Sequence, residues 1–142
     1  MLMSDREYIL ELVELLSELH VLYAEAKAKL DVVIPNADVN NISKRFYGTE
    51  LGEALRPLTN ADIVLGDTHT LCLLYMTNAV DDTTFMKEFS KISRARLSCV
   101  DIKTYIATVK VYLNAYKNPV NDIKPIIDVL SMKFMNPEII PF

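Results

Sequence analysis

The stretch Ile102–Lys117 reads IKTYIATVKVYLNAYK and decides the fold class of this chain. Its apolar residues recur at steps of three and four, as on one face of an α-helix, and its lysines fall on the opposite side. The apolar set is Ile102, Tyr105, Ile106, Val109, Tyr112, Leu113 and Tyr116. Pro119 follows, and a proline cannot continue a helix. The stretch therefore predicts an amphipathic helix whose wide apolar face is buried.

Further helical patterns surround this stretch. The segment before it, Thr83–Val100, is also helical in pattern, and the two together predict a helical hairpin in the middle of the domain. Other helices are expected from a capping box at Ser4 to Leu30, over Asp38–Tyr47 and Thr49–Leu55, from Asp67 or Thr68 to about Val80, and over Asn121–Phe134. Pro57 is expected to close the helix before it, and residues 60–65 are either a turn of helix or an extended link.

The chain has only three glycines and no two-residue alternation, which leaves little room for strands. We therefore predict one all-α domain over residues 1–142, without a linker. Its expected architecture is a single compact bundle of about seven helices around a buried central helical hairpin.

Composition narrows the classes of partner. The net charge of −4 argues against nucleic acid, because neutralisation of phosphates supplies most of that affinity. No apolar run approaches the ~20 residues of a membrane span, and the start lacks the pattern of a signal peptide. We therefore expect a cytoplasmic protein with no membrane anchor. Its two cysteines, Cys72 and Cys99, are expected to be buried free thiols.

Few residues carry the chemistry of an enzyme. The sequence has no glycine-rich phosphate loop, no Gly-x-Ser-x-Gly and only two histidines. His69 and Cys72 have one-turn spacing and would, with Cys99 and His20, formally complete a tetrahedral zinc site. One such pair without a second at diagnostic spacing is a weak signal. We expect no enzymatic activity, no metal and no cofactor.

The stretch 76–90, MTNAVDDTTFMKEFS, carries a resemblance to a known family. It resembles the segment of the Bcl (B-cell lymphoma) apoptosis-regulator family written Phe-Arg-Asp-Gly-Val-Asn-Trp-Gly-Arg, with Val80 on the family's valine. Phe89-Ser90 matches a Phe-Ser one turn further on, and 97–101 resembles the family's Leu-Cys-Val-Glu with one residue inserted. Tyr112-Leu113-Asn114 before Pro119 is similar to its Tyr-Leu-Asn and Pro-Trp, and 4–11 to its first helix.

The chain departs from the family at its signature. Asn-Trp-Gly-Arg is replaced by Asp81-Asp82-Thr83-Thr84, and the Gly-Gly-Trp turn before the last helix is missing. No segment between residues 36 and 58 gives a clear Leu-x-x-x-Gly-Asp death-motif helix. Such erosion suits a divergent viral prosurvival member, which would act in the host-cell cytoplasm.

The resemblance implies a helical bundle with a surface groove, and this groove receives the amphipathic death-motif helix of a pro-apoptotic Bcl-family protein. It therefore implies an inhibitor of apoptosis that acts by sequestering that helix. By position, the groove residues are Ile42, Arg45, Phe46, Leu51, Leu55, Leu71, Tyr75, Thr84, Met86 and Lys87. Thr84 occupies the slot of the family's arginine, which pairs with a peptide aspartate. Lys87 is the expected substitute and Arg45 the second choice. The alternative for each apolar residue is plain core.

A self-assembling helical protein, such as a virion or scaffold component, is a different class of function. Its feature would be the acidic face of the first helix meeting a basic face of a neighbour, the latter formed by Lys87, Lys91, Arg94 and Arg96. Two solvated faces are the plainer interpretation of both sets. The sequence leaves homodimerisation open.

Overall fold

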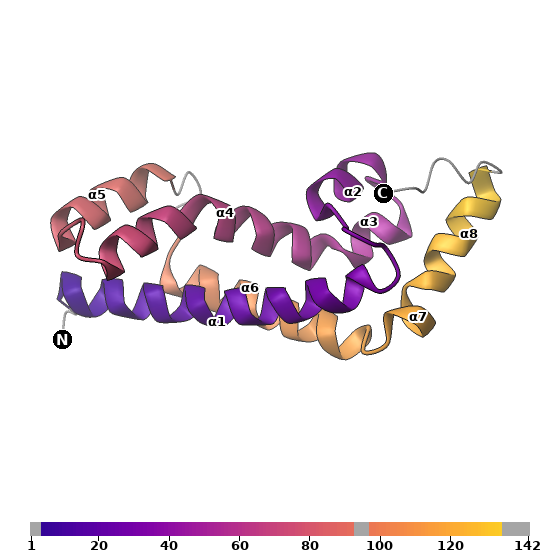
Figure 1. The fold of residues 1–142 in the computed structure, drawn as a ribbon, viewed down its shortest axis with the longest axis horizontal. Coiled ribbons are helices and arrows are strands. Elements are labelled where there is room, and N and C mark those ends of the chain that lie inside the picture. The colour runs from indigo at the N-terminus through magenta and orange to yellow at the C-terminus, as the bar shows by residue number, and fades with distance from the viewer. Residues whose placement is uncertain (1–3, 93–96, 135–142) are drawn as a thin grey trace.

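The structure, a computed structural model, describes residues 4–92 and 97–134, the last four of them as backbone only (Figure 1). The described residues form helices and no strand, which confirms the all-α prediction. The elements are α1 (Asp5–Asp31), α2 (Val39–Arg45), α3 (Glu50–Ala54), α4 (Arg56–Met76), α5 (Asp82–Ile92), α6 (Cys99–Ala115), α7 (Pro119–Asp122) and α8 (Lys124–Phe134). No helix in this part of the chain is long and apolar enough to cross a membrane.

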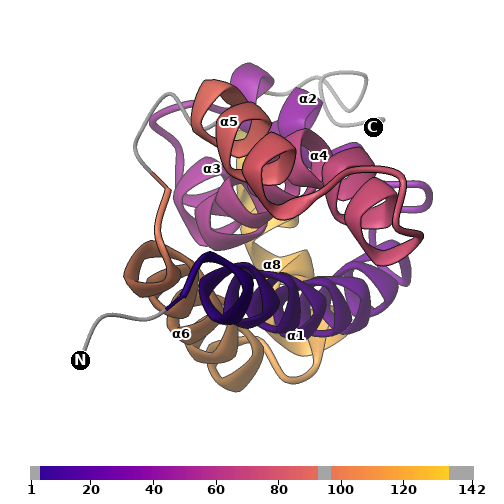
Figure 2. The same ribbon diagram turned by 90° about the vertical axis from the view of Figure 1, so that its left-hand side faces the viewer.

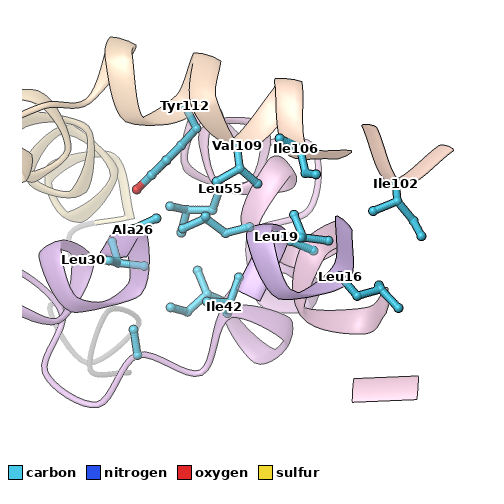
Figure 3. Close-up of a cluster of buried hydrophobic side chains, with 14 of the residues drawn as sticks. Leu16, Leu19, Ala26, Leu30, Ile42, Leu55, Ile102, Ile106, Val109 and Tyr112 are labelled. Carbon is cyan, nitrogen blue, oxygen red and sulfur yellow. The ribbon is translucent and has the colours of Figure 1, made fainter. Parts of the chain in front are cut away.

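Seen along the long axis, the helices form two layers (Figure 2). α4 and α5 lie in one layer, α1 and α6 lie in the other, and the short helices gather toward the far end. α1 packs against α4, α5 and α6, and α4 packs against α1, α2, α3, α5 and α6. The buried side chains of α1 recur at helical spacing along its whole length: Ile9, Leu12, Leu16, Leu19, Ala26 and Leu30. One contiguous core results, and part of it is drawn in Figure 3.

α1 and α6 run side by side in the same direction. Lys103 Nζ lies 3.5 Å from Glu11 Oε1, and Lys110 Nζ lies 3.5 Å from Glu18 Oε1. Both partners advance by seven residues, which is the repeat that keeps two helices in register along a shared seam. These ion pairs are largely exposed, so each contributes on the order of 0–1 kcal/mol. The ion pairs thus show the register in which α1 and α6 pack, while the stability of the contact comes from the apolar side chains between the two helices.

The predicted central hairpin is wrong in its pairing. α5 packs against α4 and α1, and in the described residues α6 packs mainly against α1 and α4 instead of against α5. The two buried aromatic residues of α5 explain its position: the Phe85 ring lies 5.1 Å from that of Tyr75 on α4 and 5.6 Å from that of Phe89. The neighbour of α6 is therefore α1 instead of α5, which the predicted hairpin placed beside it.

The predicted helix Thr83–Val100 is also wrong at its end. α5 ends at Ile92 within the described residues, and 93–96, with Arg94 and Arg96, lie outside them. α6 starts afresh at a capping box: the Ser98 hydroxyl accepts from the Asp101 N–H at 3.3 Å, and the Asp101 carboxylate accepts from the Ser98 N–H at 2.8 Å. A residue engaged this way stands outside the helix that it caps, so a single helix cannot run through it.

α4 is longer than predicted. Pro57 stands in its first turn, where a missing N–H costs nothing, so this proline opens α4 instead of closing α3. Residues 60–65 are helical, which settles the alternative that the sequence left open. Thr68 does not start a helix, because its hydroxyl donates to the Val64 carbonyl at 2.8 Å inside α4.

Candidate functional site

The ten residues predicted for a peptide groove divide into a buried and an exposed set. The six large apolar ones lie in the core with at most 9% of their surface exposed: Ile42, Phe46, Leu51, Leu55, Leu71 and Tyr75. They therefore occupy the positions that the alternative interpretation gave them, and within the described part of the chain they do not line an open groove together.

The other four lie at the surface on two elements, Arg45 on α2 and the remaining three on α5. Arg45, Thr84 and Lys87 are exposed, and Met86 is half-buried. The Arg45 guanidinium lies over the Phe46 ring, 5.8 Å from its centre. Neither Arg45 nor Lys87 lines either of the two openings described below.

Thr84 belongs to the cap of α5. Its N–H donates to Asp81 Oδ1 at 2.8 Å, and this hydrogen bonding from Thr84 lowers the pKa of Asp81. The neighbouring Asp82 accepts from the Tyr75 hydroxyl at 2.7 Å, which raises the pKa of Tyr75 and ties α5 to α4. These residues line a polar hollow of about 700 Å³, formed by 78–84, Tyr75 and Arg6 of α1. The cation that shares this hollow with Thr84 is Arg6.

An apolar groove lies between α1 and α4, with a cavity volume of about 290 Å³. Its lining comes from facing sides of the two helices: Val13, Leu16, Ser17, His20 and Val21 from α1, and Leu65, Thr68, His69, Cys72, Leu73 and Met76 from α4. Val21 is 67% exposed, Met76 64% and Leu73 49%. Large apolar side chains left this open along one groove mark a binding surface.

The polar hollow continues the apolar groove along the same two helices. On α4 the groove ends at Met76, and the hollow is lined by the neighbouring Tyr75 and by residues 78–84, which follow the helix. On α1, Arg6, Val13 and His20 are seven residues apart, so they project from one face. A guanidinium therefore stands beyond the end of a groove whose walls carry no Asp, Glu, Lys or Arg among the described residues.

The four residues that could formally have held zinc do not lie together in the structure. His20, His69 and Cys72 line the groove, whereas Cys99 lies beside Tyr8 on the other side of α1. Residues 4–92 and 97–134 contain no group of three or more His, Cys, Asp or Glu side chains placed to hold a metal ion. Burial raises the pKa of Cys72 to about 11, so its thiol stays protonated at neutral pH.

The sequence held a partial signal for this groove. Val13 lies on the apolar side of the first helix but off its core stripe, which makes that side wider than one contact seam requires. Arg6, Val21 and Met76 gave no such signal, since nothing in the local pattern says that α4 lies opposite them.

Comparison of this chain with protein-family models, with curated proteins and with solved structures finds no match. The likeness to the Bcl family is therefore carried by the quoted residues alone.

Proposed function

We propose that this protein binds an amphipathic helix of another protein in the α1–α4 groove. By the resemblance in 76–90, the partner class is the death-motif helix of pro-apoptotic Bcl-family proteins. The protein would then inhibit apoptosis by sequestering that helix in the cytoplasm, which requires neither catalysis nor a cofactor.

The dimensions of the groove support this partner. From Leu65 to Met76, α4 rises about 16 Å along the groove, at ~1.5 Å per residue. A helix with apolar anchors at i, i+3 or i+4, and i+7 needs about 10 Å, so its anchors fit within that length. The exposed Val21, Leu73 and Met76 would be covered by those anchors, and burial of apolar surface at about 25 cal/mol per Å² drives such binding.

Arg6 supplies the charge that the replaced signature lacks. A death-motif helix presents an aspartate beside its anchors, and Thr84 cannot pair with it as an arginine would. Arg6 lines the same hollow as Thr84 and follows the groove on the same face of α1. It forms no ion pair with any residue in 4–92 or 97–134, so its guanidinium is available for a bidentate contact with a carboxylate. In this proposal Arg6 takes the role that the sequence gave to Lys87.

Two matched valines test the groove. Val21 in the groove and Val111 on the outer side of α6 are 67% and 69% exposed, so a glutamate at either should leave the fold intact. In a fluorescence-anisotropy titration with labelled death-motif peptides, Val21→Glu should weaken binding tenfold or more, because it places a charge against the apolar anchors. Val111→Glu should bind as the wild type does.

Arg6 and Lys87 form the second pair of variants. Arg6→Ala should weaken the same peptides roughly tenfold, since a charge-assisted hydrogen bond contributes about 1.5–3 kcal/mol, and Lys87→Ala should change nothing. The opposite outcome would return the role to Lys87. If no peptide binds the wild type at micromolar concentration, the proposed function is wrong.

A further inference from the structure

A second exposed apolar surface lies on the outer side of α6 and shares no lining residue with the α1–α4 groove. It is a hollow of about 550 Å³, formed by Pro57 at the start of α4 and by one face of α6: Val100, Lys103, Thr104, Ala107, Thr108 and Val111. Val100 is 71% exposed and Val111 69%. Positions 100, 104, 107 and 111 alternate steps of four and three, as in a seam where one helix packs on another. We call this surface the α6 hollow.

Cations stand at both edges of the α6 hollow. Lys103 and Lys110 rise on the side toward α1, and their side chains are 61% and 60% exposed despite their ion pairs with α1. Arg56 precedes Pro57 on the other side, is 69% exposed, and lies 3.7 Å from Glu53. An apolar hollow edged by accessible cations fits an apolar side chain that is flanked by carboxylates.

The N-terminal half of α1 carries such a group on its outward face. Leu10 is 50% exposed, and Glu7 and Glu14 stand three residues before and four after it, so all three share one face. Neither glutamate forms an ion pair with a described residue in 4–92 or 97–134. We call Glu7, Leu10 and Glu14 the acidic stripe.

The acidic stripe cannot reach the α6 hollow of its own molecule. The Lys103–Glu11 and Lys110–Glu18 ion pairs fix α1 along the flank of α6, and Leu10 then faces solvent (Figure 2 shows the two helices side by side). Within one molecule both surfaces stay open. Between two molecules, an exposed leucine flanked by glutamates can meet an apolar hollow edged by lysines and an arginine.

We infer that the α6 hollow binds the acidic stripe of a second copy of this chain. Leu10 enters between Val100 and Val111 over Ala107, and the two flanking carboxylates lie within reach of the edge lysines. The α6 hollow against itself is disfavoured, because it would bring the two lysine rows together. Since the two surfaces differ, each copy can bind one neighbour on either side, and the contact builds chains or rings instead of closed dimers.

The association should be weak and dependent on salt. A contact built on one helix pair buries less than the ~1,200 Å² of a stable interface, and exposed charges are screened beyond about 10 Å at 0.1 M salt. In sedimentation velocity at 50 mM salt, the average mass should rise steadily between about 10 μM and 1 mM. The rise should shrink at 500 mM salt.

Two single variants and their mixture test whether the α6 hollow of one copy binds the acidic stripe of another. Val111→Glu breaks the α6 hollow and keeps the acidic stripe, and Glu14→Lys does the reverse. Both positions are exposed, and a circular dichroism spectrum checks the fold of each. Each variant alone should stay monomeric over the range where the wild type grows. An equal mixture should form a dimer and nothing larger, since only one intact hollow and one intact stripe remain to meet.

The other outcomes overturn the inference. A wild type that is monomeric at every concentration shows that the hollow does not bind a second copy. Association by Glu14→Lys alone would mean that α6 pairs with itself, and association by Val111→Glu alone would mean that another surface is used. If either variant misfolds, Val100→Glu or Glu7→Lys replaces it. The inference is independent of peptide binding in the α1–α4 groove, which Val111→Glu leaves intact.

Discussion

α1 packs against two long helices, and the two interfaces differ. Its contact with α6 is parallel and closed: Figure 3 shows Ile106 and Val109 pointing toward Leu19 of α1, with the Lys–Glu pairs outside. Its contact with α4 is antiparallel and half open, with core side chains on one side and the apolar groove on the other. One face of α1 is thus closed by α6, and the edge of another stays open as the groove for which we propose a partner helix.

The half-open interface is held by a polar cluster at its closed end. The Asp62 carboxylate of α4 accepts from the Tyr23 hydroxyl of α1 at 2.9 Å and from the Asn40 amide of α2 at 2.6 Å. One carboxylate therefore fixes three helices at a point beyond the groove. This arrangement allows the groove to stay open without letting α4 slide along α1.

The closed interface should tolerate truncation least. Leu19→Ala should lower the free energy of unfolding by about 2–5 kcal/mol, because Leu19 is fully buried and its removal leaves a cavity. Leu73→Ala on the groove wall, where the side chain is 49% exposed, should lower it by less than ~1 kcal/mol. Urea denaturation measures both, and equal effects would show that the two interfaces are equally closed.

Removal of the Asp62 carboxylate should cause the next largest loss in the free energy of unfolding. Asp62→Ala leaves the Tyr23 hydroxyl and the Asn40 amide without their acceptor, so it should destabilise the protein by about 1–3 kcal/mol. The double variant with Tyr23→Phe should be less than additive, because the two groups are direct partners. Strict additivity in a double-mutant cycle would contradict the hydrogen bond.

Tyr112 should contribute to the loss of stability in alkali. Its hydroxyl is buried without a hydrogen-bond partner among the described residues, and burial raises the pKa of Tyr112 to about 12. The unfolded chain loses this proton near pH 10, so above pH 10 the unfolded state binds fewer protons and stability falls as pH rises to about 12. Tyr112→Phe should be near neutral at pH 7 and should remove part of that alkaline loss, while Tyr23, whose pKa is raised by burial and by its hydrogen bond to Asp62, should retain another part. An alkaline loss equal to that of the wild type would assign it entirely to other groups.

The ion pairs outside the α1–α6 interface should have the smallest effect on the free energy of unfolding. Lys110→Ala should change the free energy of unfolding by less than ~1 kcal/mol, because the side chains of Lys110 and Glu18 are 60% and 48% exposed. The effect should vanish in 1 M salt, where charges are screened within about 3 Å. A larger loss that resists salt would mean that the lysine stem packs on the helix beneath it.

Local pattern predicted elements well and their pairing poorly. The three-four spacing located α6 and α1 within a few residues, since a helical period needs no information from the rest of the chain. It failed at Pro57 and Ser98, where one residue can either end an element or begin the next. It could not reveal that α6 pairs with α1 instead of with α5, because the partner of an apolar face is a long-range property.

In the candidate site, too, the local sequence pattern does not tell which apolar residues are buried and which line the groove. Ile42 and Phe46 on the one hand and Val13 and Val21 on the other are all apolar residues at helical spacing. The first pair is buried and the second lines the groove, and only the packing of distant helices distinguishes them. Arg6 was in the sequence as an ordinary cation of the first turn, and its place beside Thr84 follows from the return of α4 toward the start of α1.

The parallel pairing of α1 with α6 also shapes how the chain reaches its native state. Glu11 and Lys103 are 92 positions apart, and two parallel helices need a long crossover, which here consists of α2 to α5. During synthesis α1 leaves the ribosome before α2 to α6 and remains without its main partner until α6 has followed. Its apolar faces are then open to other molecules, and closing so large a loop slows folding relative to bundles of sequential neighbours. Until α6 has been made, α1 is thus open to misassembly with other molecules.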